Sequence, residues 1–395
     1  MSRGDPRILL FTGKGGVGKS TIAAGTACLA ARRGLRTLVL STDAAHSLAD
    51  AFGVHRPGPD PTQVDDLLHL QQVDAQRRFE ASWSEISRYL RSVLDAGGVD
   101  PVTAEELTVL PGAEEVLALL ELRLQVRTGD WDAVVVDCAP TAETLRLLAL
   151  PEALGWYMHR VFPVERRVVR ALGPVLSRAA GVPMPEDNVF GAVQRLHGEL
   201  DEVRSLLAGP RASVRLVLTP ENVVLAEARR SLTTLSLYGY RVDGAVVNRV
   251  FPEAGADEWR ARWVAAQAEV MGRVRESFVG LPLWRACYRD DEPVGTAALA
   301  ALAEELYAGH DALADPSGAE PLRFTRDGAA TTLRLALPLV ERSDVDLTRH
   351  GDELAVTVAA YRRLLTLPPA LARHSVTGAR VVDGELQVRF EETTA

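Results

Sequence analysis

The sequence predicts an α/β protein: a doubly wound, mostly parallel sheet with a helical insertion, followed by a small C-terminal all-β sandwich. A short apolar run of strand type, residues 7–12, leads through a glycine-rich turn into the start of a helix. The apolar runs 36–42 and 131–137 are nearly continuous, which is typical of parallel strands buried on both faces. After residue 318 the apolar period changes from helical spacing to alternation, which indicates half-buried antiparallel strands.

The same periodicities predict the other elements in chain order. A helix over residues 23–33 is closed by Gly34, and two regions, 57–129 and 150–210, look mainly helical. Beyond them we expect strands at 213–219 and 241–249 and helices at 189–207, 222–237 and 296–307.

Composition places the chain among ordinary globular proteins. Its 395 residues are enough for about two or three domains. The net charge of −9 and the pI near 5.5 argue against a nucleic-acid partner. We divide the chain into domains 1–313 and 319–395, because residues 314–318 read as a linker.

The glycine-rich turn fits the phosphate-binding pattern G-x-x-x-x-G-K-[ST], and it stands between a strand and a helix as that pattern requires. Glycines let backbone N–H groups surround an anion, and the helix N-terminus adds a partial positive charge. Lys19 would reach the β- and γ-phosphates of ATP, and Ser20 would ligate Mg²⁺. The predicted nucleotide-binding residues here are Gly13, Lys14, Gly15, Gly16, Val17, Gly18, Lys19, Ser20 and Thr21.

Asp43 directly follows the second predicted strand. An aspartate at the carboxyl end of a parallel strand points at the nucleotide crevice. There it would orient the attacking water beside the γ-phosphate. The alternative is an ordinary helix N-cap, a frequent role of aspartate. The neighbouring phosphate loop favours the catalytic role.

Lys14 stands directly after the first glycine, where no basic residue is needed to cradle phosphate. This K-G-G-x-G-K-[ST] form resembles the deviant Walker A motif of dimeric P-loop ATPases. That group includes ArsA-type arsenite-pump ATPases, tail-anchored-protein targeting ATPases, MinD/ParA proteins and nitrogenase iron protein. The resemblance implies a homodimer in which Lys14 reaches the partner's nucleotide and neutralises developing charge, as an arginine finger does.

Two further motifs narrow this resemblance to the arsenite-pump and tail-anchor-targeting ATPases. Residues 43–47 resemble the switch I motif D-P-A-H-S, with Ala44 in place of the proline. Residues 137–146 resemble the switch II motif D-x-A-P-T-G-x-T-L-R, with Ala142 in place of the glycine. In this motif Asp137 would hold Mg²⁺ through water.

The resemblance also suggests residues around the base. Asn248 ends a V-V-N run similar to that of the family's adenine-recognition asparagine, and an amide can both donate to and accept from adenine. The alternative for Asn248 is a turn former at a strand end. Pro282, in residues 280–283, resembles part of the loop that covers the adenine.

In the resembled family, helical insertions form a subdomain whose apolar face receives hydrophobic client helices. Regions 57–129 and 150–210 would provide that subdomain here, and adaptable apolar side chains suit varied clients. The alternative is that these side chains are internal core. The candidate client-contacting side chains are Phe79, Trp83, Leu120, Trp156, Met158 and Phe162.

The C-terminal segment alternates apolar and polar residues at 331–337, 354–358 and 386–390, with glycine-containing turns between such runs. This pattern, within domain 319–395, resembles the α-crystallin domain of small heat-shock proteins. A small β-sandwich of chaperone type is therefore expected.

The three cysteines, Cys28, Cys138 and Cys287, are far apart in sequence. This spacing fits a reducing compartment and gives no disulfide framework. Neither a signal peptide nor an apolar run long enough to span a bilayer is recognisable. We therefore expect a cytoplasmic protein, which leaves room for a peripheral membrane receptor.

Together these features predict a homodimeric, Mg²⁺-dependent ATPase that binds and releases hydrophobic helical client proteins. Its catalytic residues would be Lys14, Lys19 and Asp43, with Ser20 and Asp137 at the metal. One alternative is the ATPase subunit of an arsenite or metalloid efflux pump, although soft metalloids prefer clustered thiolates. Another is a nucleotide-binding switch or scaffold without client chaperoning.

Overall fold

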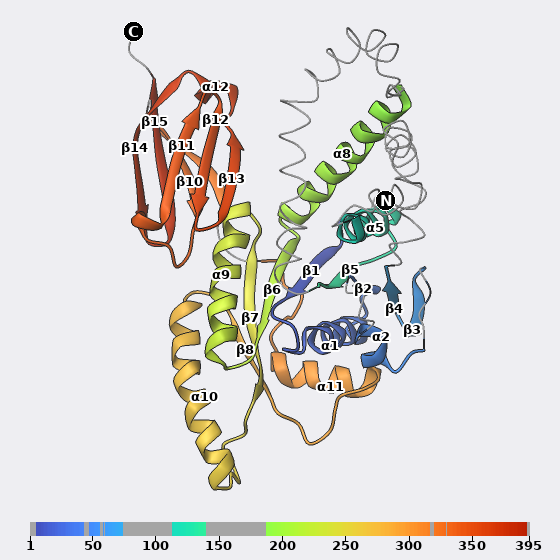
Figure 1. Cartoon of the computed structure of the whole chain (residues 1–395). Helices are drawn as coiled ribbons and strands as arrows, with labels where there is room; N and C mark the ends of the chain where they lie inside the picture. Colours follow the sequence, from blue (N-terminus) through green and yellow to red (C-terminus); the bar gives the residue numbers. More distant parts are fainter. Residues whose placement is uncertain are drawn as a thin grey trace, which may run out of the picture.

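The computed structural model describes residues 5–42, 47–55, 58, 60–73, 113–139, 187–316, 320–328 and 330–392. An eight-stranded sheet, ordered β3-β4-β2-β5-β1-β6-β7-β8, forms its centre (Figure 1). All neighbouring pairs are parallel except β3 and β4. The strands are β1 (Arg7–Thr12), β2 (Thr37–Ser41), β3 (Thr62–Asp65), β4 (Leu68–Gln72), β5 (Ala133–Asp137), β6 (Ala212–Leu218), β7 (Val242–Val250) and β8 (Leu283–Cys287). The predicted doubly wound fold is confirmed.

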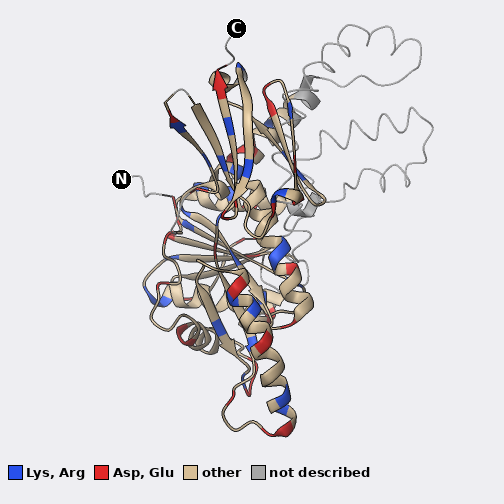
Figure 2. Cartoon of the chain, turned by 90° about the vertical axis from the view of Figure 1, so that its left-hand side faces the viewer, with Lys and Arg blue, Asp and Glu red and all other residues tan. Residues whose placement is uncertain are grey.

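Helices cover both faces of the sheet, as the fully buried strands β1, β2, β5 and β6 require. One face carries α1 (Lys19–Arg32), α2 (Ser47–Phe52) and α11 (Thr296–Tyr307), and the other α5 (Ala113–Thr128), α8 (Asp187–Ala208) and α9 (Asn222–Tyr238) (Figure 1). Helix α10 (Glu258–Ser277) packs beside α9 and extends past the sheet (Figures 1 and 2). Among the described helices, none combines the length and apolar character needed to cross a membrane.

One sequence prediction fails within region 57–129. Residues 62–72 form β3 and β4 of the central sheet rather than helix. Strand β3 is a short, largely exposed edge strand with an aspartate at its end, so its sequence lacks the apolar alternation that predicts strands. Residues 113–128 are helical as predicted, whereas the helical predictions at 74–112 and 150–186 fall outside the described residues.

The C-terminal segment is the predicted sandwich of two antiparallel sheets. One sheet has the order β14-β15-β10-β9 and the other β11-β12-β13. Alternate side chains of both sheets, among them Leu333, Val356 and Phe390, form a common buried core. The elements are β9 (Leu322–Asp327), β10 (Ala330–Ala336), the 3₁₀ turn Arg342–Asp344, β11 (Val345–His350), β12 (Glu353–Val358), β13 (Tyr361–Thr366), α12 (Pro369–Ala372), β14 (His374–Val382) and β15 (Glu385–Glu392).

Helix α9 joins the sandwich to the sheet-bearing part of the chain. Leu237, near the end of α9, is fully buried and belongs to the core of the sandwich. The buried Arg363 of β13 donates a hydrogen bond to the Leu237 carbonyl at 2.6 Å. The Thr233 hydroxyl of α9 donates to the Pro338 carbonyl at 2.8 Å. The sandwich is therefore packed against the sheet-bearing part, not merely tethered by the linker.

Candidate nucleotide-binding site

The glycine-rich loop leaves the carboxyl end of β1 and leads into α1. Two of its glycines are required by close contacts. A Cβ on Gly13 would lie 2.0 Å from the Val217 carbonyl oxygen of β6. A Cβ on Gly18 would lie 2.3 Å from the Asn248 side-chain nitrogen, and Gly18 has a left-handed φ of 92°. The loop therefore fits tightly between β6 and β7, a fit that only glycine permits.

Lys19 opens helix α1 and is 6% exposed. Its ammonium donates to the Lys14 carbonyl at 3.4 Å and has no carboxylate partner among the described residues. No side chain caps the helix, and no acidic residue lies in its first turn. Burying a charge without a counter-charge is unfavourable. This end of α1 therefore has both a buried cation and uncapped N–H groups for an anion.

Other loop positions agree with a phosphate cradle. The Thr12 hydroxyl at the end of β1 is buried and has no hydrogen-bond partner among the described residues. Ser20 and Thr21 are half-buried in the first turn of α1. Lys14 is half-buried, and its side chain has no ion-pair partner in the described part of the chain. The residues present thus fit a nucleoside triphosphate with its Mg²⁺.

Asp137 is brought next to this loop by the strand order. It is fully buried at the end of β5 and lies beside Phe11 of β1 in the register of the sheet. The Cys138 amide donates to the Phe11 carbonyl at 3.1 Å. The carboxylate predicted to hold the metal therefore lies at the carboxyl ends of the strands, where the phosphate loop begins.

Thr42 fixes the carboxyl end of β2 against the end of β5. Its amide donates to the Asp137 carbonyl at 3.0 Å, and its hydroxyl accepts from the Ala139 amide at 3.2 Å. Asp43 is the next residue in the chain but lies outside the described residues. Its predicted role as the water-orienting carboxylate stays a prediction.

Asn248 lies at the carboxyl end of β7, in contact with the loop. Its side-chain Nδ2 donates to the Val17 carbonyl at 2.9 Å. Its Oδ1 accepts from the Arg249 amide at 2.9 Å. Asn248 therefore braces the phosphate loop, a contact that sequence reasoning did not foresee. Its recognition of adenine stays a prediction.

Pro282 is not brought together with the other predicted residues. It precedes the amino end of β8, where its carbonyl accepts from the Ala245 amide at 3.0 Å. Asn248 lies three residues further along β7, about 10 Å at the usual rise of a strand. Strand β8 was not predicted, so residues 280–283 were assigned to the loop that covers the adenine, although they precede this strand. The segment that leaves the carboxyl end of β8 is 288–295.

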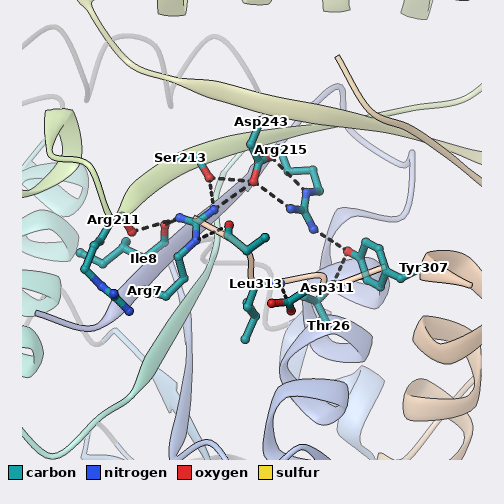
Figure 3. Close-up of polar contacts among 11 residues, drawn as sticks. Arg7, Ile8, Thr26, Arg211, Ser213, Arg215, Asp243, Tyr307, Asp311 and Leu313 are labelled. Atoms are coloured by element: carbon teal, nitrogen blue, oxygen red, sulfur yellow. Dashed lines mark hydrogen bonds and ion pairs between the residues drawn. The ribbon is translucent and has the colours of Figure 1, made fainter. Parts of the chain in front are cut away.

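A buried polar network, also missed from the sequence, lies toward the amino ends of β1 and β7 (Figure 3). Asp243 of β7 receives one hydrogen bond from Arg7 of β1, at 3.0 Å, and two from Arg215 of β6, at 2.8 and 3.1 Å. Both arginines are 2% exposed. Two cations around one carboxylate hold the three strands in register, since removing one partner would leave a buried charge.

The same network reaches the helix that carries the loop. Arg215 donates to the Tyr307 hydroxyl of α11 at 3.0 Å (Figure 3). That hydroxyl lies 2.7 Å from the Thr26 hydroxyl of α1, which itself donates to the Ile22 carbonyl. The signal in the sequence was the presence of arginine and aspartate within otherwise apolar strands.

An anion cradle between the first strand and first helix of a mostly parallel sheet defines a P-loop NTPase-like protein. Comparisons with known proteins identify the ATPase family. A model of the anion-transporting ATPase family matches residues 6–308. A model of the HSP20-like domain found in ArsA proteins matches residues 328–390. The chain belongs to the anion-transporting (ArsA) ATPase family, as the sequence motifs predicted.

Several relatives align with this chain over nearly their whole length. A protein of Chlorobaculum tepidum named arsenical pump-driving ATPase is 36% identical over 98% of this chain and 96% of its own. A similarly named protein of Aquifex aeolicus is 30% identical over 97% of this chain and 99% of its own. An uncharacterized protein of Streptomyces coelicolor is 40% identical over 97% of each chain.

Proposed function

We propose that this ATPase is a homodimeric, Mg²⁺-dependent nucleotide switch that binds and releases hydrophobic helical client proteins. The observation that carries the nucleotide part is the buried Lys19 ammonium, which has no carboxylate partner among the described residues. A triphosphate supplies the missing negative charge, so binding relieves an unfavourable burial in the free protein. ATP binding would thereby stabilise the conformation of the phosphate loop.

Lys14 gives the switch its dimeric character. Its half-buried side chain lacks an ion-pair partner in the described part of the chain, although its carbonyl is engaged by Lys19. A cation that is not needed by its own loop is available to the nucleotide of a second copy. ATP would then join two subunits through Lys14, and hydrolysis would release them.

Hydrolysis would use carboxylates at the ends of β2 and β5. The anchored Thr42 holds the chain beside Asp137 immediately before Asp43, which supports Asp43 as the group that orients the attacking water. Ser20 and Asp137 are the residues that would hold Mg²⁺. When bound, that ion neutralises charge on the β- and γ-phosphates.

The client part of the proposal rests on the sequence and on family resemblance. Of the candidate side chains, Leu120 alone lies in the described residues, and it packs half-buried against the main core. We therefore assign Leu120 to the core. Phe79, Trp83, Trp156, Met158 and Phe162 lie outside the described residues and remain the candidates for client contact. A cytoplasmic location fits this activity and stays a prediction.

The second candidate is the driving subunit of an arsenical pump, which the names of the relatives favour. Against it stand the cysteines, which are free thiols on three separate segments. Burial raises the pKa of the Cys28 thiol to about 12, so it is a poor source of the thiolate that As(III) requires. Stimulation of ATP hydrolysis by arsenite would favour the pump function if it occurs in the wild type and is lost when all three cysteines are replaced by serine.

A phosphate-release assay with and without an apolar helical peptide tests the proposal. We expect ATP hydrolysis that depends on Mg²⁺ and that the peptide changes in rate. A scrambled, polar peptide of equal length is the control. Hydrolysis without a peptide effect leaves an ATPase without client binding. Nucleotide binding without hydrolysis would refute the proposal and favour a scaffold.

A further inference from the structure

A groove of about 590 Å³ lies where α9, α10 and the C-terminal sandwich meet. Its α9 wall runs from Asn222 to Leu237, and the lining residues are mostly three or four positions apart, so they form one face of the helix. At the rise of an α-helix this face is roughly 22 Å long. The sandwich adds the segments around Val340 and Tyr361. The groove therefore has the volume of a ligand pocket and an elongated shape.

The sandwich end of the groove is apolar. Leu339 is exposed there, and Val340 and Tyr361 are half-buried. Val358 and, from α9, Leu237 continue this lining. Apolar surface left open between two packed parts of a protein is covered favourably by an apolar group. This end of the groove therefore suits a hydrocarbon.

The threonine hydroxyls along the groove are already used as donors. The Thr233 hydroxyl donates to the Pro338 carbonyl at 2.8 Å, and the Thr234 hydroxyl donates to the Arg230 carbonyl at 2.9 Å. A peptide in the groove would bring an N–H and a C=O group at nearly every residue, and each needs a partner when it is buried. An aliphatic chain needs none and therefore fits this lining better.

Two arginines of α9 line the groove and have no carboxylate partner among the described residues. Arg229 donates to the Ser277 hydroxyl of α10 at 3.2 Å. The Arg230 side chain forms no hydrogen bond or ion pair within the described part of the chain. A guanidinium binds a carboxylate through two parallel hydrogen bonds. The two arginines therefore fit a carboxylate head group.

The other charges of the lining do not neutralise these arginines. Arg273 of α10 adds a third positive charge, and its partner is the exposed Glu269 at 3.6 Å. Asp344 is the one acidic residue of the lining within the described ranges, and its carboxylate accepts from the Glu341 amide at 2.9 Å. Net positive charge beside apolar surface is complementary to a ligand with an anionic head and an apolar tail.

We propose that this groove binds a medium-chain alkyl carboxylate, the anion of a fatty acid. Arg229 and Arg230 would hold the carboxylate, and the chain would lie along α9 toward Leu237. Arg230 and Leu237 are roughly 10 Å apart along the helix, a distance that a medium alkyl chain spans. The ligand would contact α9 and the sandwich together and so stabilise their packing. This inference goes beyond the proposed nucleotide switch and does not depend on it.

Isothermal titration of the full chain with decanoate, without nucleotide and below the concentration at which decanoate forms micelles, tests this inference. We expect saturable binding at one site. Octanoate and hexanoate should bind progressively more weakly, by about three-fold for each CH₂ removed, because less apolar surface is buried. Decanol, which has the same chain length without the charge, should bind on the order of ten-fold more weakly.

Two substitutions test the two ends of the ligand. Arg230→Gln should raise the dissociation constant for decanoate on the order of ten-fold. Arg262→Gln, at an exposed arginine of α10 outside the groove, is its control. Leu339→Asn should raise the constant on the order of five-fold. Leu339 has a left-handed φ of 66°, which asparagine tolerates, so the fold is kept. Leu67→Asn, at an equally exposed leucine with a φ of 59°, is the matched control.

The outcomes leave the proposed nucleotide switch untouched. Absence of decanoate binding, or binding that neither Arg230→Gln nor Leu339→Asn weakens, would overturn the inference. Decanol that binds as tightly as decanoate would remove the role of the arginines. A short acidic, apolar peptide that displaces decanoate and binds more tightly would replace the fatty-acid anion by a peptide as the occupant.

Discussion

The side-chain amide of Asn248 donates a hydrogen bond to the Val17 carbonyl at 2.9 Å and so braces the phosphate loop from the neighbouring strand β7. The two residues are 231 positions apart in sequence. The glycine at position 18 is what allows this approach, because a Cβ there would overlap the amide nitrogen. The conformation of the phosphate loop therefore depends on a side chain that is distant from it in sequence.

Asn248→Ala should weaken nucleotide binding through a looser loop. Because the observed contact is to the loop and not to a base, we expect the affinities for ATP and GTP to fall by similar factors. A neutral hydrogen bond contributes about 1 kcal/mol, which corresponds to roughly five-fold in affinity. Isothermal titration with both nucleotides measures this. A loss confined to ATP would instead support adenine recognition by Asn248.

Lys19→Met should abolish ATP binding and stabilise the free protein. The substitution removes a buried charge that lacks a carboxylate partner in the described structure and keeps an unbranched side chain of similar length. Replacing buried charges by apolar groups of similar volume often raises the free energy of unfolding by about 1 kcal/mol or more. Thermal unfolding without nucleotide checks this. A lowered melting temperature would mean that Lys19 is already stabilised in the free protein.

Asp43→Asn should leave ATP affinity nearly intact and reduce turnover on the order of 10²-fold or more, the scale of general-base loss. The reason is that Asp43 would act on the attacking water and not on the phosphates. Steady-state phosphate release and nucleotide titration of the same preparation separate the two effects. Turnover equal to that of the wild type would remove Asp43 from the mechanism.

The sandwich should lose stability at low pH through Glu385. Burial would raise the pKa of this carboxyl, but hydrogen bonds from Arg334 and Gln387 and the charge of Arg323 lower it overall. A lowered pKa contributes stability above the unfolded-state value, and that stability is lost as the pH falls through the folded-state value.

Glu385→Gln should therefore lower the melting temperature of the full chain near neutral pH, and the difference from the wild type should shrink in acid. A loss on the order of 1 kcal/mol is expected for one charge-assisted contact. Glu391→Gln is the matched control, because the Arg389–Glu391 pair is largely exposed and contributes little. An equal difference at both pH values would show that the charge of Glu385 is not what stabilises the sandwich.

Local sequence signals predicted the central part of the site. The strand, glycine loop and helix around Lys19 are contiguous in sequence, and the apolar run before Asp137 has the composition of a buried strand. The alternating C-terminal strands were recognisable for the same reason, since their period is visible within a few residues. Such features depend on neighbours in the chain, which the sequence displays directly.

Contacts between distant segments could not be predicted in this way. The edge strand β3 has no apolar face to reveal it. Because β8 was not predicted, Pro282 was expected at the carboxyl ends of the strands, whereas it lies at the amino end of β8. The Arg7–Asp243–Arg215 network joins three strands, and the sequence shows only isolated charges within apolar runs. The ring contacts of Phe251 with Trp259 and Tyr288 likewise join three segments that only the folded sheet brings together.

Sedimentation velocity of Lys14→Ala with Mg²⁺ and a non-hydrolysable ATP analogue tests the ATP-dependent dimer most directly. We expect the wild type to dimerise with the analogue but not with ADP. The variant should bind ADP normally, stay monomeric with the analogue and lose hydrolysis, because the cation that would reach the second subunit's nucleotide is gone. A variant that dimerises as tightly as the wild type would contradict the role of Lys14 between subunits.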